Sequence, residues 1–167
     1  MFIREEYRDI IIQSIKHCQA KKGLLVHGWC VMTSHVHLIL STGNLDGTNE
    51  KKRLEDIIRD MKSFTSKSIR GLLENKEHLA ESRREWMYWM MQRAGIKNPN
   101  NKDFQFWMQH NHPIELRTEL FLLQKLEYIH NNPVVAGFID RPEYWKYSSA
   151  VDYYGTGKGL LDVAFLL

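Results

Sequence analysis

The sequence predicts an α+β fold in which helices pack on one face of a small antiparallel sheet. Two short apolar runs stand three residues apart, and several longer segments place apolar residues at helical spacing. The expected order is therefore helix, strand, strand, helix, helix, strand, helix. With 167 residues and no internal repeat, the whole chain, 1–167, is expected to form one domain.

The first three elements are expected to be a helix and a β-hairpin. Apolar residues recur at helical spacing over residues 4–22, and Gly23 follows as a stop signal. These apolar residues are Tyr7, Ile10, Ile11, Ile15 and Cys18. Residues 24–31 and 35–41 are predicted strands, because both are short apolar runs and the connection between them suits an antiparallel turn.

A long second helix is expected over about residues 50–74, after a turn-rich stretch. Several basic residues lie off its apolar stripe, among them Lys52, Arg59, Lys62, Lys67 and Arg70. A solvated charged face is the ordinary interpretation of such residues. They are also candidate contacts to DNA phosphates, although Glu55, Asp56 and Asp60 dilute the positive charge.

The second half of the chain is expected to hold two more helices and a strand. Residues 77–94 look helical up to Gly95, and residues 96–103 form a loop. A strand is expected next, because Phe104, Phe106 and Met108 stand at alternate positions, as on one face of a strand. The last strong helix is expected over residues 115–130, and Pro133 limits its extension. Leu116, Leu120, Leu123 and Leu126 are its expected stripe.

Composition sets the class of protein and its expected compartment. No apolar run approaches the roughly 18 residues that span a bilayer, and the N-terminus does not resemble a secretory signal. Cys18 and Cys30 stand among apolar residues, so we expect two buried thiols in the reducing cytoplasm. The net charge of +3 permits nucleic-acid binding but does not argue for it alone.

The histidines of the second predicted strand are candidate metal ligands. His35 and His37 are two residues apart, so on a strand their side chains share one face, while Val36 points to the core. Two imidazoles on a rigid strand can hold one metal ion together. The pattern also occurs by chance: His110 and His112 repeat it just before a proline, where we interpret them as loop or substrate-side residues.

The last strong helix offers a candidate nucleophile. Tyr128 and Asn132 are four residues apart, which places them on one helix face, one turn from each other. A metal ion beside a tyrosine can polarise a phosphate, and the amide oxygen of Asn132 suits a hard cation. A packing tyrosine followed by a helix end and a turn remains an alternative interpretation of the same residues.

Two stretches carry a resemblance to a known family. HGWCVMTSHVHLIL, from His27 to Leu40, resembles the histidine–hydrophobic–histidine (HUH) strand of single-tyrosine transposases. LEYIHNNPVVAGFIDRPEYWKYSSAVDYYG, from Leu126 to Gly155, resembles the tyrosine helix and tail of the REP-associated tyrosine transposases, a branch of the IS200-like insertion-sequence transposases. The resemblance covers about residues 5–155 and rests on the order and separation of the two motifs.

The resemblance implies a function and a site. Members of the family cleave and rejoin single-stranded DNA beside hairpins through a 5′-phosphotyrosine intermediate. By matching positions, Tyr128 is the nucleophile, and His35, His37 and Asn132 bind Mg²⁺ or Mn²⁺. The family fold is a ferredoxin-like antiparallel sheet. Single-stranded or hairpin DNA is the implied partner of a monomer or homodimer without membrane association.

One departure and three alternatives remain open. Family members usually have a strand before the first helix, and here that strand is missing, which would leave a sheet edge open for a second copy. The chain is alternatively a domesticated protein that binds hairpin DNA without cleaving it. It is otherwise a relaxase or rolling-circle initiator, although many of those carry two neighbouring tyrosines. A small metalloprotein with no nucleic-acid role is the most distant alternative.

Overall fold

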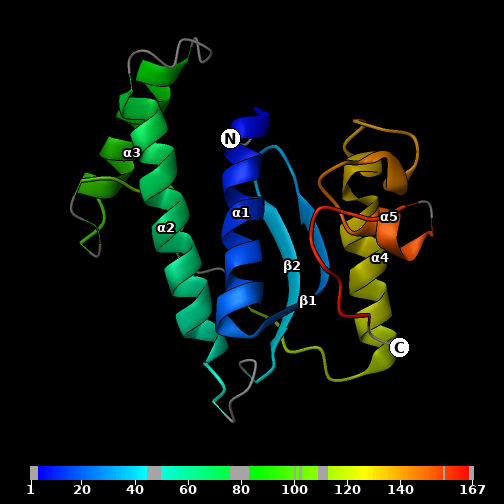
Figure 1. Ribbon diagram of the computed structural model, residues 1–167. Coiled ribbons are helices and arrows are strands. Elements are labelled where there is room, and N and C mark those ends of the chain that lie inside the picture. Colours follow the sequence, from blue (N-terminus) through cyan, green and yellow to red (C-terminus); the bar gives the residue numbers. More distant parts are fainter. Residues whose placement is uncertain are drawn as a thin grey trace. The chain divides into compact units, whose positions relative to one another are not determined.

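The computed structural model describes residues 4–44, 50–75, 83–99, 101, 103–108, 113–155 and 157–165 (Figure 1). The described residues contain both helices and an antiparallel sheet, so the fold is α+β. The chain divides into two compact units, and the single domain expected over residues 1–167 stays a prediction. Unit 1 comprises residues 1–58 and 114–167, and unit 2 comprises residues 59–113. No helix in the described ranges has the length and apolarity needed to cross a membrane.

Unit 1 begins with the predicted helix and hairpin. Helix α1 (Glu5–Lys22) ends where Gly23 takes a positive φ of 67° and its N–H donates to the Cys18 carbonyl. Strands β1 (Leu24–Val31) and β2 (Val36–Thr42) pair antiparallel. A bulge interrupts the pairing between Val26 and Gly28. These three predicted elements are confirmed to within a few residues.

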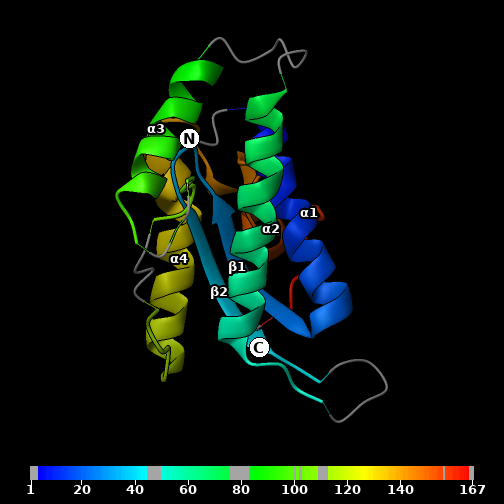
Figure 2. The same ribbon diagram turned by 90° about the vertical axis from the view of Figure 1, so that its left-hand side faces the viewer.

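Helices cover both faces of the hairpin, so the expectation that they share one face is wrong. Figures 1 and 2 show α1 and α4 (Glu119–Val135) on opposite sides of β1 and β2. Gly28 faces α4, because a Cβ at this position would stand 2.5 Å from a methyl of Leu126. The face that carries His37 therefore continues into a core, in which Ile39 is buried against Leu126. Val36, on the other face, is only half-buried.

The outer edge of β1 is covered by the C-terminal part of the chain. The Val31 N–H donates to the Tyr147 carbonyl at 2.8 Å, and the Ser149 N–H donates to the Trp29 carbonyl at 2.9 Å. Further along, the Ala164 N–H donates to the Val26 carbonyl. These bonds satisfy backbone groups that an edge strand would otherwise expose to another chain.

Helix α4 differs from its prediction at both ends. It starts after Thr118, whose side chain accepts from the Phe121 N–H, and it continues through Pro133 to Val135. A proline in the last turn removes only its own N–H, so the Ala136 N–H still donates to Asn132. The buried stripe comprises Leu126, Ile129, His130 and Pro133. The expected stripe was wrong at Leu120 and Leu123, which are exposed. Two short helices follow, η1 (Pro142–Tyr144) and α5 (Ala150–Tyr153).

Unit 2 is built on α2 and α3. Helix α2 (Leu54–Glu74) begins in unit 1 and has most of its length in unit 2, and α3 spans Arg84–Ile96. The strand expected at Phe104, Phe106 and Met108 is not formed, because its backbone bonds to a helix instead of a strand. The Gln105 N–H donates to the Met91 carbonyl of α3 at 2.9 Å, and Phe104 is buried beside Gly95.

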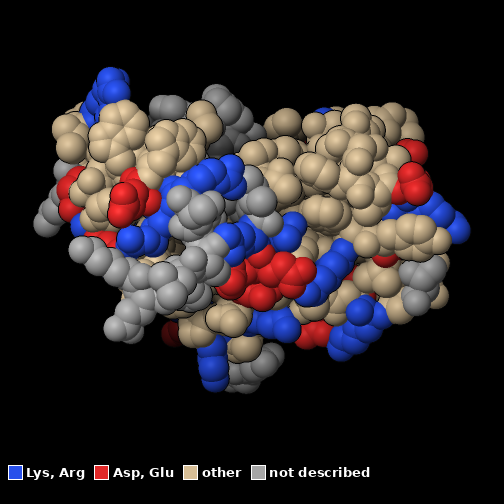
Figure 3. Space-filling view, turned by 90° about the horizontal axis from the view of Figure 1, so that it is seen from above, with Lys and Arg blue, Asp and Glu red and all other residues tan. Residues whose placement is uncertain are grey.

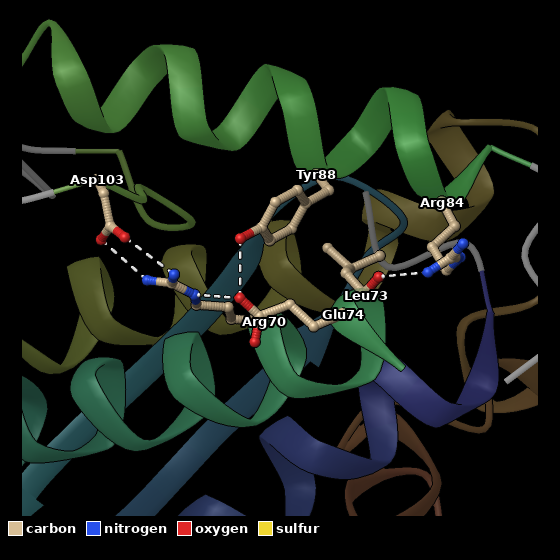
Figure 4. A network of polar contacts seen from close by, with 6 residues as sticks. All are labelled: Arg70, Leu73, Glu74, Arg84, Tyr88 and Asp103. Carbon is tan, nitrogen blue, oxygen red and sulfur yellow. Dashed lines mark hydrogen bonds and ion pairs between the residues drawn. The ribbon is translucent and has the colours of Figure 1, made fainter. Parts of the chain in front are cut away.

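A polar network joins the elements of unit 2 (Figure 4). The guanidinium of Arg70 donates to both carboxylate oxygens of Asp103 at 2.9 Å and to Glu74 at 2.8 Å. The Tyr88 hydroxyl of α3 also donates to Glu74. Near the start of α3, Arg84 donates to the Leu73 carbonyl of α2. The network fixes the loop at residue 103 and α3 to the same turns of α2.

Candidate metal and tyrosine site

The two histidines lie where β2 begins. His35 is the last residue of the turn, and its carbonyl accepts from the Met32 N–H at 2.9 Å. His37 is the second residue of β2 and stands opposite Cys30 of β1. The two ring centres are 4.7 Å apart, with the ring planes nearly perpendicular. The first residues of β2 and the residue before it therefore bring the two imidazoles side by side, as the two-residue spacing predicted.

The surroundings of the rings favour the neutral form that binds metals. Burial lowers the pKa of His35 below its ordinary value. Burial also lowers the pKa of His37, and the charge of His35 adds to this shift, whereas a side-chain interaction with Asn132 opposes it. The Nδ1 atom of His35 bonds to the Ser34 hydroxyl at 2.9 Å, which leaves Nε2 as the ring nitrogen for a cation.

Helix α4 brings Tyr128 to the histidines. The Tyr128 ring centre lies 5.6 Å from that of His37, and the residue is 57% exposed, so its hydroxyl is accessible from solvent. The side chain of Leu126, two residues before the tyrosine, packs directly over Gly28, where an added Cβ would stand 2.5 Å from its methyl and displace it. Sequence spacing had left open whether the tyrosine helix meets the histidine strand, and the structure places the two together.

Asn132 lies one turn after Tyr128, within the helix. Its Nδ2 donates to the Tyr128 carbonyl at 2.7 Å, and its side chain also acts on the pKa of His37. Because the amide nitrogen is engaged, the oxygen is the atom that can bind a cation. The helix thus holds both its predicted site residues close to His37.

One observation indicates that these side chains could bind a metal ion. The Nε2 atom of His37 is buried and has no hydrogen-bond partner in the part of the chain that the structure describes. A buried imidazole nitrogen without a partner is costly unless a ligand completes it. Among the described residues, no group of three or more His, Cys, Asp or Glu side chains surrounds a common point. The candidate set is therefore the two imidazoles and the Asn132 amide.

One cationic neighbour of the tyrosine escaped the sequence analysis. The ammonium of Lys125 lies 5.8 Å from the ring centre of Tyr128 and 5.1 Å from that of Phe121. Its position three residues before the tyrosine on one helix was the available signal. A positive charge here would attract a phosphate approaching Tyr128.

The one histidine of α4, His130, has a structural role that the sequence analysis also missed. His130 is buried, and its Nε2 bonds to the Ser149 hydroxyl at 2.8 Å. The same hydroxyl accepts from the Trp29 N–H of β1 at 2.9 Å. Burial lowers the pKa of His130 to about 4, so the ring is neutral near pH 7. This contact ties the tyrosine helix to β1.

The five basic residues predicted to contact DNA differ in their surroundings. Lys52 lies before α2, and Arg59 and Lys67 are exposed on it. The Lys62 ammonium lies 5.9 Å from the Trp107 ring centre. Arg70 is different, because its guanidinium nitrogens already donate to Asp103 and Glu74. On the face that Figure 3 shows, basic side chains alternate with acidic and uncharged ones.

The second histidine pair of the sequence adds no described residue to the site, and comparison with known proteins gave no match. His110 and His112 lie outside the described residues. No protein-family model matches the chain, and neither the curated proteins nor the solved structures contain a match.

Proposed function

We propose that this protein is a metal-dependent endonuclease and strand transferase that cleaves and rejoins single-stranded DNA through Tyr128. The observation that carries the proposal is the approach of the Tyr128 ring to 5.6 Å from the His37 ring, with His35 alongside. These groups come from segments about 90 residues apart in the sequence, and they match the two motifs that resemble single-tyrosine transposases.

Each residue has a distinct part in the proposed reaction. The Tyr128 oxygen attacks the scissile phosphorus and forms a phosphotyrosine bond as its phenol proton is lost, while the bond to the 3′ oxygen breaks and that oxygen takes up a proton to leave a 3′-hydroxyl. Rejoining is the reverse attack by a 3′-hydroxyl on the phosphotyrosine, so the bond energy is conserved and no nucleotide cofactor is needed. Lys125 attracts the phosphate to the tyrosine.

The metal would be Mg²⁺ or Mn²⁺, held by the Nε2 atoms of His35 and His37 and by the amide oxygen of Asn132. When bound, it would polarise the scissile phosphate and offset the charge that develops there. The unpartnered Nε2 of His37 and the engaged amide nitrogen of Asn132 support this assignment. The proposed fold is a ferredoxin-like sheet built around β1 and β2.

A covalent-adduct assay tests the proposal. The full chain is incubated with a labelled oligonucleotide that carries a hairpin and a single-stranded flank, together with Mn²⁺, and is then run on a denaturing gel. We expect a protein–DNA adduct in the wild type and none in Tyr128→Phe. Tyr144→Phe is the matched control, because Tyr144 is exposed to a similar extent, 62%, but is absent from the site.

The assay also separates the alternatives. An adduct that persists in Tyr128→Phe would overturn the assignment of the nucleophile. Tight hairpin binding without an adduct would identify a binding protein that does not cleave. A relaxase with two neighbouring tyrosines is not favoured, because α4 contains a single tyrosine.

A further inference from the structure

Helix α3 has two apolar sides, and the rest of unit 2 covers one of them. Met87, Met91 and Gly95 are buried on the covered side. Gly95 lies so close to Phe104 that an added Cβ would collide with its backbone. The helix is thus already anchored in unit 2 by one side.

The other side carries an exposed row that we name the tryptophan stripe: Trp86, Trp89, Arg93 and Ile96. Steps of three, four and three residues keep these side chains on one side of a helix. Trp86 and Trp89 are 56% and 52% exposed, which is costly for the largest apolar side chains. The Arg93 guanidinium lies 5.3 Å from the Trp89 ring centre.

The charges around the stripe are complementary to a polyanion. Arg83 stands just before its start and Lys97 follows its end, whereas Arg84 is engaged by the Leu73 carbonyl. The carboxylate within α3, Glu85, lies 3.6 Å from Arg84 and is thereby compensated. Flat aromatic rings among basic side chains suit unpaired bases on a phosphate backbone, because any base can stack on indole.

We propose that the tryptophan stripe binds single-stranded nucleic acid by stacking unpaired bases on Trp86 and Trp89, with Arg93 and Lys97 beside the backbone. The inference rests on the proposed function for the choice of DNA as the strand. It assigns to unit 2 a binding surface separate from the candidate metal and tyrosine site of unit 1.

The test compares two strands of equal charge. Binding of a fluorescent oligothymidine and of the same strand with abasic positions is measured with the full chain carrying Tyr128→Phe, in EDTA. The oligothymidine should bind more tightly than the abasic strand. In Trp86→Ala/Trp89→Ala the affinity for oligothymidine should fall by about tenfold for each tryptophan, with little change for the abasic strand.

Three controls make the result specific to stacking. Trp86→Phe/Trp89→Phe should keep most of the affinity, because phenylalanine also stacks, while the quenching of tryptophan fluorescence on binding decreases. Phe64→Ala should leave the affinity unchanged, since Phe64 is an aromatic of α2 with similar exposure, 53%, that lies outside the stripe. Thermal unfolding checks that each variant is folded.

Two outcomes would overturn the inference. One is an equal loss of affinity for both strands, which would indicate charge or fold effects. The other is unchanged affinity together with a lower molecular mass in solution, which would identify the stripe as a contact between copies of the chain. The binding assay needs neither Tyr128 nor metal, so a negative result would overturn the tryptophan stripe but not the proposed DNA cleavage. Absence of a covalent adduct would overturn the proposed cleavage but not base stacking on the stripe.

Discussion

At the scale of residues, the candidate site of unit 1 brings two imidazoles and a phenol within a few ångströms of one another. The imidazoles stand 4.7 Å apart, and Tyr128 is 5.6 Å from His37. Partial burial lowers the pKa of both histidines, which favours the neutral form that binds a cation. Tyr128 itself remains accessible to a long substrate.

Replacing a histidine should separate binding from cleavage. His35→Ala or His37→Ala is expected to abolish the covalent adduct while leaving DNA affinity within a few-fold of the wild type, because phosphate contacts elsewhere supply most of the binding. Adduct formation and affinity are measured in parallel with Mn²⁺. Cleavage that survives both substitutions would contradict the metal assignment.

The thiol of Cys30 should be inert in the folded protein. Burial raises its pKa from 9.0 to about 12, so the unfolded chain loses this proton at a lower pH than the folded chain does. The stability linked to the thiol is complete below pH 9 and is lost as the pH rises toward 12. Alkylation by iodoacetamide at pH 8 to 10, followed by mass spectrometry, should modify Cys30 only after denaturation. Modification of the native protein would contradict the burial.

At the scale of elements, β1 is held between partners that lie far from it in the sequence. Its outer edge bonds to Tyr147 and Ser149, and its side toward α4 is kept flat by Gly28. The position of the tyrosine helix therefore depends on the tail as well as on the hairpin.

Ser149→Ala should destabilise this arrangement. The Ser149 hydroxyl serves both the buried Trp29 N–H and His130, so its removal leaves two buried groups without a partner. The free energy of unfolding should fall by about 1–3 kcal/mol. Ser63→Ala, an exposed change on α2, should remain within about 0.5 kcal/mol. Denaturant unfolding measures both, and equal values would exclude the proposed role of the hydroxyl.

Arg70 of α2 is expected to contribute to stability, whereas Lys67 is expected to contribute to DNA binding. Arg70→Met should lower stability by about 1 kcal/mol with little effect on DNA affinity, because its guanidinium is engaged by Asp103 and Glu74. Lys67→Met should weaken DNA binding across all sequences without loss of stability. Unfolding and binding curves of both variants test this contrast, and a base-specific effect of Lys67 would count against phosphate contact.

At the scale of the whole molecule, a net charge of only +3 predicts moderate electrostatic binding. If four basic residues each neutralise one phosphate of a single strand, the logarithm of affinity should fall with that of salt with a slope of about −3. The four are Lys52, Arg59, Lys62 and Lys67. The slope is measured by titrating a fluorescent single-stranded oligonucleotide with the Tyr128→Phe variant at several salt concentrations. A slope near zero would favour a metalloprotein without a nucleic-acid role.

The sequence by itself determined the local features of this protein. Helix α1 with its stop at Gly23, the β1–β2 hairpin and the shared face of His35 and His37 all follow from periods of two and 3.6 residues. The one-turn relation between Tyr128 and Asn132 follows in the same way. Such features depend on neighbours within a few positions, which the order of residues contains directly.

Only the tertiary structure decided which of these features meet. Helix α4 covers the histidine face through a cluster in which Leu126 and Ile129 pack against Ile39, and the edge of β1 is covered by a tail more than 100 residues away. Helical spacing also selected Leu120 and Leu123 as core, whereas packing buried Ile129 and His130 instead. Burial is set by the surfaces that pack together over long range, and no local period contains that information.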